Sequence, residues 1–279
     1  MIIAKTIAEV RKITNDWRKQ GLNIALVPTM GYLHEGHESL INKAVSENDK
    51  VVVSIFVNPK QFGPGEDLET YPRDMEKDSI LCEKNSVDLI FAPEASEMYF
   101  DDSCTSVIVS SLTEGLCGSK RPGHFNGVCL VVSKLFNIVK PNRAYFGEKD
   151  AQQLAVIKRL VRDLSFDVEI VGCPIVRESD GLAKSSRNSY LNKNERAAAL
   201  VLSKSLFNAS KSIKAGLNDV NLIKELIINE ISKEPLARID YIEVVDSLSL
   251  KNAENLKSSV LIAIAVYIGK TRLIDNITI

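Results

Sequence analysis

The chain has 279 residues, 45% of them hydrophobic and 25% charged, a composition that predicts a folded protein rather than a disordered one. The 35 basic and 36 acidic residues leave a net charge of −1, which argues against a protein that coats DNA or RNA. No apolar run approaches the ~20 residues that span a bilayer, and charges interrupt the N-terminal apolar residues. Five cysteines without a Cys-x-x-Cys pair favour reduced thiols and a cytoplasmic location.

The first 175 residues predict alternating strands and helices. Thr6 and Glu9 form a capping-box pattern that opens a helix, and Gly21 ends it. Strands are expected at 23–27, 50–57, 88–92, 144–146 and 167–171, with a further strand at 105–109. Helices are expected at 37–48, 73–85, 127–139 and 150–164. This alternation predicts an α/β fold, a Rossmann-like parallel sheet with helices on both faces.

The last hundred residues have a different pattern. Helical periodicity covers 194–215 and 218–232, and strands are expected at 239–245, 260–266 and 271–274. Helices followed by clustered strands predict a small α+β domain. We therefore expect a Rossmann-like domain at 1–175 and a C-terminal domain at 176–279.

Two of the three histidines, His34 and His37, lie in a glycine-containing loop between a predicted strand and a predicted helix. Ligands of parallel sheets bind at the carboxyl ends of the strands, and a helix N-terminus attracts phosphate. The alternatives are a zinc site, for which the His-Glu-Gly-His spacing is one residue short, and two structural histidines. The pattern favours phosphate binding.

Three further loops carry polar side chains at predicted strand ends. The segment 180–188 has two cations and two hydroxyls beside a glycine, which suits a triphosphate or, alternatively, a solvated linker. The segment 146–153 offers Lys149 to a phosphate and Asp150 to a ribose, or merely a capped helix start. Gln61 in 56–63 suits a small polar ligand, or a surface turn. No Walker loop, dinucleotide fingerprint or nucleophile elbow is present, so these loops favour electrostatic rather than covalent catalysis.

Six segments, in order over about 160 residues, carry a resemblance to a known family. They are PTMGYLHEGH (28–37), FVNPKQF (56–62), TYPRD (70–74), RPGHFNGV (121–128), FGEKDAQQ (146–153) and DGLAKSSRNSYL (180–191). The sequence resembles the pantoate–β-alanine ligases (pantothenate synthetases) of the nucleotidylyltransferase superfamily. The resemblance implies ATP-dependent condensation of pantoate with β-alanine through a pantoyl-adenylate, giving pantothenate, AMP and pyrophosphate, with Mg²⁺ bridging the phosphates.

The resemblance also implies roles for individual residues. Catalytic charge stabilisation falls to His34, His37, Lys149 and Arg187 and also to Ser185 and Ser186, with His37 matching the family's proton donor. The ATP-binding residues are Met30, Gly31, Tyr32, Leu33, His34, Glu35, Gly36, His37, Gly147, Glu148, Lys149, Asp150, Val176, Lys184, Ser185, Ser186 and Arg187. Pantoate and β-alanine are expected at Met30, Gln61 and Gln153, and no protein side chain is expected to ligate a metal. The family resemblance further implies a homodimer with a C-terminal domain that acts as a lid. The charge balance and the short apolar runs predict no nucleic-acid or membrane partner.

One position departs from the family pattern. Lys184 stands where the family usually has methionine, and it adds a second cation near Arg187. It is expected either to strengthen contact with the triphosphate or to turn to solvent.

Two other functions fit parts of the pattern. A nucleotidylyltransferase of the same fold would need a basic acceptor site and would not need the two glutamines. A non-catalytic nucleotide-sensing module is opposed by the intact set of phosphate-loop residues.

Overall fold

The computed structural model describes all 279 residues, which divide into two compact units. The N-terminal unit comprises residues 1–110, 121–148 and 153–174. The C-terminal unit comprises residues 175–279 together with the short segments 111–120 and 149–152. Two segments from the first part of the chain therefore belong to the second unit, which a single boundary near residue 175 does not anticipate.

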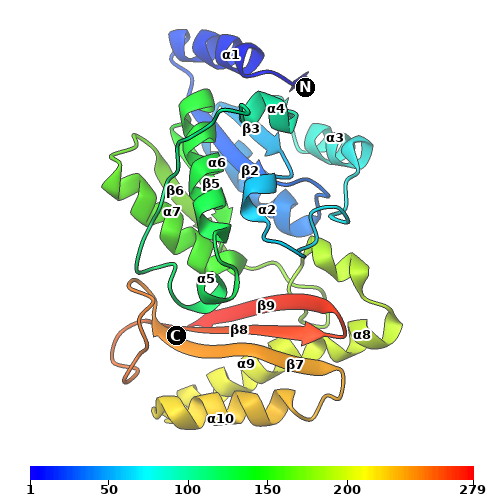
Figure 1. Ribbon diagram of the computed structural model, residues 1–279, viewed down its shortest axis with the longest axis vertical. Coiled ribbons are helices and arrows are strands. Elements are labelled where there is room, and N and C mark those ends of the chain that lie inside the picture. Colours follow the sequence, from blue (N-terminus) through cyan, green and yellow to red (C-terminus); the bar gives the residue numbers. More distant parts are fainter. The chain divides into compact units, whose positions relative to one another are not determined.

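The N-terminal unit is built on a six-stranded parallel sheet with strand order β1-β4-β3-β2-β5-β6 (Figure 1). Its strands are β1 (Ile2–Ala4), β2 (Ile24–Thr29), β3 (Lys50–Ile55), β4 (Leu89–Phe91), β5 (Arg143–Gly147) and β6 (Glu169–Cys173). Its helices are α1 (Ile7–Lys19), α2 (Glu35–Glu47), α3 (Met75–Lys84), α4 (Ala95–Met98), α6 (His124–Val139) and α7 (Ala151–Asp163), the first two residues of which belong to the C-terminal unit. Short 3₁₀ helices are η1 (Pro59–Gln61) and η2 (Glu148–Asp150), whose last two residues lie in the C-terminal unit. The Rossmann-like sheet expected from the alternation is confirmed.

The sheet is covered on both faces, as its almost continuously apolar strands require. Alternate residues of β2 and β3, such as Val27 and Val53, pack against Ile41 of α2 and Cys82 of α3. Helices α1 and α6 also contact β2. Thr6 caps α1 and Glu9 returns the bond to the Thr6 backbone, so the predicted capping box is confirmed.

The C-terminal unit is a three-stranded antiparallel sheet with helices against one face (Figure 1). Its elements are α5 (Leu116–Lys120), η3 (Ser186–Tyr190), α8 (Lys193–Ala198), α9 (Leu200–Lys214), α10 (Val220–Ile231), β7 (Ala237–Asp246), β8 (Val260–Ile268) and β9 (Thr271–Thr278). Ile262 and Ile264 of the central strand pack in one cluster with Leu206 of α9 and Ile227 of α10. The small α+β domain expected from the sequence is confirmed.

Two local predictions are wrong. Residues 105–109 form no strand, and Ile108 remains 67% exposed, because no neighbouring strand is there to pair with it. The single helix expected at 194–215 is two helices, α8 and α9, divided at Ala199.

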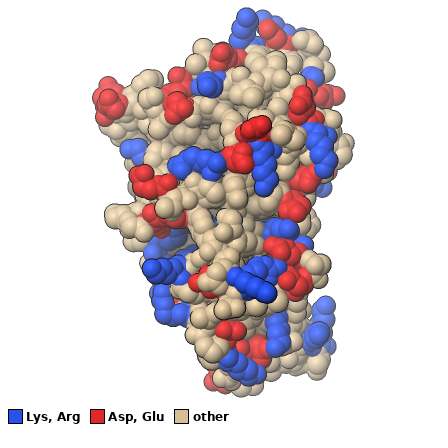
Figure 2. Space-filling view, turned by 90° about the vertical axis from the view of Figure 1, so that its right-hand side faces the viewer, with Lys and Arg blue, Asp and Glu red and all other residues tan.

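Basic and acidic side chains are interspersed over the surface drawn in Figure 2, in keeping with the net charge of −1.

Candidate active site

The two histidines lie at the start of α2, beside the point where the strand order reverses. Strand β2 pairs with β3 at six residues but with β5 only at Ala25 and Leu26, so its carboxyl end parts from β5. Such a switch point opens a crevice at the carboxyl ends of the strands. The loop that leaves β2 here enters α2, whose N-terminus carries partial positive charge.

The histidines cap this helix themselves. Nδ1 of His34 accepts a hydrogen bond from the Gly36 N–H at 3.1 Å, and Nδ1 of His37 accepts one from the His34 N–H at 3.3 Å. Their ring centroids are 4.2 Å apart. An Nδ1 that accepts a hydrogen bond carries no proton, so this geometry corresponds to the tautomer with the proton on Nε2. Both side chains are therefore hydrogen-bond donors at Nε2.

A buried aspartate shapes the loop between β2 and α2. Asp78 of α3 is 1% exposed and accepts hydrogen bonds from the backbone N–H groups of Tyr32 at 2.8 Å and Leu33 at 2.6 Å. Burial raises the pKa of Asp78 above its ordinary value, although the two backbone donors oppose that rise. Gly31 has φ +84°, and a Cβ there would lie 2.9 Å from Ile55 and 3.0 Å from the Asp78 carboxylate. The loop therefore depends on glycine at position 31 and on a carboxylate from α3.

Two of the expected substrate residues meet in the N-terminal unit. The Gln61 side chain is 8% exposed and donates through Nε2 to the Met30 sulfur at 3.0 Å. Its Oε1 accepts from Asn58 at 3.1 Å, and Asn58 also donates to the Gly127 carbonyl of α6 at 3.1 Å. A Cβ on Gly127 would collide with the Lys60 carbonyl, so only glycine lets η1 approach α6 this closely.

The third histidine supports Gln61 from behind. His124 Nδ1 donates to the Gln61 carbonyl at 2.8 Å, and its Nε2 faces Arg121 Nη1 at 3.1 Å. Arg121 forms a bidentate pair with Glu66 at 2.6 and 2.7 Å. Burial opposes ionisation of Glu66, but the Arg121 pair outweighs it and lowers the pKa of Glu66. This chain of contacts fixes the backbone that carries Gln61.

The remaining residues of the N-terminal unit that are expected to bind ATP or substrate are more exposed to solvent. Glu35 and Glu148 are exposed, and Gly36 and Gln153 are half-buried. Gly147 ends β5 without a positive φ, and a Cβ there would meet nothing within 4 Å. Since the protein itself does not require glycine at this position, a ligand that approaches the backbone is a reason for it.

Lys149 and Asp150 belong to the C-terminal unit. The Lys149 carbonyl accepts a hydrogen bond from Asn276 of β9 at 2.8 Å. The neighbouring Asp275 is 2% exposed and binds Arg177 at 2.6 and 2.8 Å. Strand β9 thus holds both the Lys149 backbone and the side chain of Arg177, the residue next to Val176, through hydrogen bonds.

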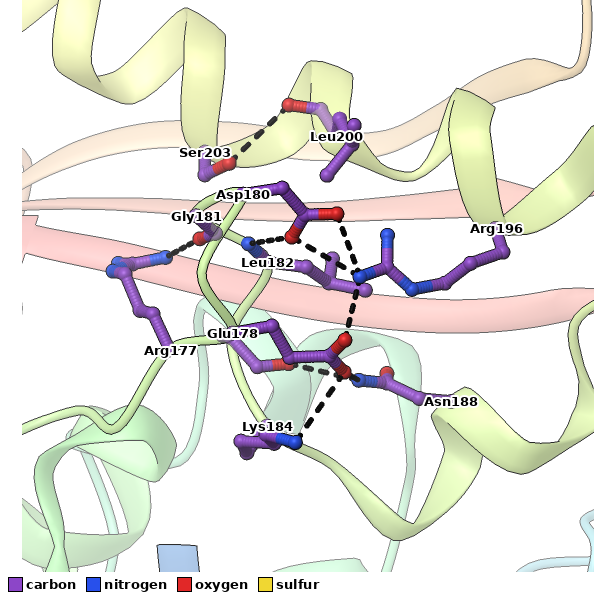
Figure 3. Close-up of polar contacts among 11 residues, drawn as sticks. Arg177, Glu178, Asp180, Gly181, Leu182, Lys184, Asn188, Arg196, Leu200 and Ser203 are labelled. Carbon is purple, nitrogen blue, oxygen red and sulfur yellow. Dashed lines mark hydrogen bonds and ion pairs between the residues drawn. The ribbon is translucent and has the colours of Figure 1, made fainter. Parts of the chain in front are cut away.

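Residues 176–184 form a tight hairpin that leads into the Ser185–Arg187 segment. The Lys184 N–H donates to the Val176 carbonyl at 2.9 Å, and the turn at Gly181 has φ +101°. Ser185 caps η3 by accepting from the Arg187 N–H at 3.3 Å, and Ser186 is buried. Lys184 lies 3.9 Å from the Glu178 carboxylate with a side chain 23% exposed, so it is not turned fully to solvent (Figure 3).

The expected site residues thus form two sets, one on each unit. Residues 30–37, Gln61, Gly147, Glu148 and Gln153 lie in the N-terminal unit, and Lys149, Asp150, Val176 and Lys184 to Arg187 lie in the C-terminal unit. Sequence reasoning missed the side chains that support them, namely Asn58, Glu66, Asp78, Arg121, His124, Arg196 and Asn276. Apart from Asn58, Arg121 and His124, which lie in motifs that carry the family resemblance, no sequence signal marks them, because each acts through a long-range hydrogen bond.

Comparison with known proteins identifies the family. The family model for pantoate-beta-alanine ligase matches residues 2–278. A pantothenate synthetase of Clostridium botulinum (strain Loch Maree / Type A3) is 64% identical over 278 residues, covering 100% of this chain and 99% of the relative. One from Clostridium acetobutylicum is 63% identical, with the same coverage.

Solved structures agree with the sequence comparison. Pantothenate synthetase from Thermus thermophilus is 44% identical with a TM-score of 0.93, over 99% of both chains. A pantoate-beta-alanine ligase from Francisella tularensis, described as a complex with beta-gamma ATP and beta-alanine, is 38% identical with a TM-score of 0.83, over 99% of this chain and 97% of that one. In the present structure, no helix has the length and apolarity that would let it cross a membrane. The chain belongs to the pantoate–β-alanine ligase family.

Proposed function

We propose that this chain joins pantoate to β-alanine at the expense of ATP, through a pantoyl-adenylate, and releases pantothenate, AMP and pyrophosphate. The observation that carries the proposal is the pair of histidines at the start of α2, beside the switch point of the sheet, whose Nδ1 atoms accept backbone N–H groups and leave Nε2 to donate. Donors at a helix N-terminus suit the growing negative charge of a phosphate in transfer. Membership of the family and the relative crystallised with an ATP ligand and β-alanine support the choice of substrates.

The first step is attack by a pantoate carboxylate oxygen on the α-phosphorus of ATP. A bond forms between that oxygen and phosphorus, the bond to the β-phosphate bridging oxygen breaks, and pyrophosphate leaves. Negative charge grows on the α-phosphate oxygens and on the leaving group, where His34, His37, Lys149 and Arg187 would stabilise it. In the second step the β-alanine amine attacks the acyl carbon, AMP leaves, and the amine loses a proton.

The histidine geometry favours hydrogen bonding over proton donation in the first step. A neutral imidazole that gave up its Nε2 proton would become an anion, and an imidazolium would lose the Nδ1 acceptor that caps α2. Pyrophosphate is a stable leaving group and does not need a proton to depart. We therefore propose that His37 acts as a hydrogen-bond donor.

Pantoate is assigned to the Met30–Gln61 contact, with Gln153 as the further amide. A buried glutamine whose backbone and side chain are both held offers a fixed donor to a hydroxyl of the substrate. We assign Mg²⁺ to the ATP phosphates and water, because Mg²⁺ keeps several waters and binds substrate phosphates in such sites.

Product analysis tests the proposal. Purified protein is incubated with Mg-ATP, pantoate and β-alanine, and each is omitted in turn. We expect AMP, pyrophosphate and pantothenate only in the complete mixture, and loss of all three in Lys149→Met but not in Lys158→Met, a change of an exposed lysine on α7. ADP and phosphate as products would overturn the adenylate, and no turnover despite ATP binding would indicate a nucleotide-sensing module.

We also propose, from the family resemblance, a cytoplasmic homodimer in which the C-terminal domain acts as a lid. Light scattering on the purified protein tests the dimer, and small-angle X-ray scattering with and without ATP tests closure. A monomeric mass, or a scattering curve that ATP leaves unchanged, would contradict the respective expectation.

A further inference from the structure

Glu178 contacts Lys184, Asn188 and Arg196 (Figure 3). Lys184 and Asn188 flank the segment Ser185–Arg187, to which ATP binding is assigned above. The Glu178 carboxylate lies 3.9 Å from Nζ of Lys184, the residue immediately before this segment. It also accepts a hydrogen bond from Asn188 at 3.3 Å, the residue immediately after it. One carboxylate therefore contacts both flanks of the segment.

Arg196 of α8 holds that carboxylate in place. Its Nη2 lies 2.6 Å from Glu178 and 2.9 Å from Asp180, so one guanidinium joins two positions of the hairpin (Figure 3). Burial opposes the charged form of Arg196, but the bonds to Glu178 and Asp180 outweigh it and raise its pKa further. The Arg196 and Glu178 side chains are each about three-quarters buried, which strengthens the pair relative to a surface ion pair.

The hairpin itself gives this contact a fixed geometry. The Glu178 N–H donates to the Leu182 carbonyl at 2.8 Å, and the Gly181 N–H donates back to the Glu178 carbonyl at 2.9 Å. Asn188 additionally donates to the Ala183 carbonyl at 3.1 Å, so η3 is tied to the hairpin at two points. The α8 helix, the hairpin and η3 therefore form one hydrogen-bonded unit around Glu178.

We propose that Arg196 and Glu178 are positioning residues that hold Ser185, Ser186 and Arg187 in the geometry that binds the triphosphate. Neither residue needs to touch ATP. The segment lacks long regular structure, so without this support it samples other conformations, and ATP binding has to order it first. The proposal rests on the proposed function for the identity of the ligand.

The same geometry determines how the Lys184 side chain contributes to ATP binding. Its ammonium lies beside Glu178, which partly neutralises it, so its main effect is to hold the flank of the segment rather than to add a full charge to the triphosphate. Replacing Lys184 by the family's methionine should therefore change ATP affinity less than replacing Arg196.

The test compares matched variants by ATP affinity, steady-state kinetics and thermal unfolding. Arg196→Met and Glu178→Gln should each weaken ATP binding about tenfold, because each removes a charged hydrogen bond. The KM for β-alanine should stay the same. The double variant should be no worse than the poorer single variant, because both changes break one pathway. Arg196→Lys should restore part of the affinity.

Lys224→Met is the control for a merely structural role. Lys224 pairs with Glu243 at 2.6 Å in the same unit, with side chains 26% and 33% exposed, and it lies outside the hairpin. The control should lower thermal stability comparably and leave ATP affinity unchanged. Unchanged ATP affinity in Arg196→Met and Glu178→Gln, or equal losses in Lys224→Met, would overturn the proposal. Turnover by the wild type tests the proposed function separately, because ATP affinity is measured by calorimetry without turnover.

Discussion

The Asp78 carboxylate is the single side chain seen to hold both backbone N–H groups of Tyr32 and Leu33, and we predict that Asp78→Asn weakens both stability and ATP binding. Asparagine offers one acceptor oxygen and one NH₂ group where the carboxylate offers two oxygens. One backbone N–H would then face a donor in a place where Leu33 is only 2% exposed. A buried donor left without a partner costs about 1–3 kcal/mol.

The assay is urea denaturation together with the KM for ATP. We expect the free energy of unfolding to fall by about 1–3 kcal/mol and the KM for ATP to rise about tenfold, because the loop that carries His34 shifts. Asp74→Asn is the matched control, since Asp74 caps α3 and asparagine caps a helix equally well. Wild-type stability and KM in Asp78→Asn would refute the role given to this carboxylate.

Three further predictions test neighbouring parts of the site. Gly147→Ala should leave thermal stability unchanged, since a Cβ meets nothing there, and should raise the KM for ATP; an unchanged KM would show that no ligand approaches this backbone. His37→Gln should keep a larger share of kcat than His37→Leu, because glutamine can both cap α2 and donate a hydrogen bond; equal loss in both would favour proton donation. In Glu66→Gln, the decrease in the free energy of unfolding relative to the wild type should be largest above about pH 4. This decrease should vanish as the solution is acidified and the wild-type carboxylate is protonated. The reason is that a lowered carboxylate pKa stabilises the folded state only when the group is ionised; a pH-independent difference in urea denaturation would contradict it.

Local signals in the sequence were enough for most of the fold. The apolar run 23–27, which ends at Pro28, and the Thr6–Glu9 capping box each lie in the element expected of them. Strand β1 was missed because three residues carry no periodicity, and it exists through its pairing with β4. The prediction for residues 105–109 is wrong for the opposite reason: their β-branched composition suits a strand, but a strand also needs a partner strand.

The candidate site, like the fold, was predictable from local sequence patterns only in part. Sequence patterns placed the histidines at a strand-to-helix loop and paired Met30 with Gln61 through the family resemblance, and the structure brings the latter two into contact. The supporting contacts join residues far apart in sequence, such as Asp78 with Leu33, and Asn276 with Lys149. No local pattern encodes such pairs, because their partners are set by the folded topology.

The measurement that tests the central claim most directly is exchange of labelled pyrophosphate into ATP with pantoate present and β-alanine absent. An adenylate formed in the first step is reversible, so we predict exchange that depends on pantoate and is lost in Lys149→Met but not in Lys158→Met. No exchange under conditions in which the complete mixture yields pantothenate would contradict a separate pantoyl-adenylate step.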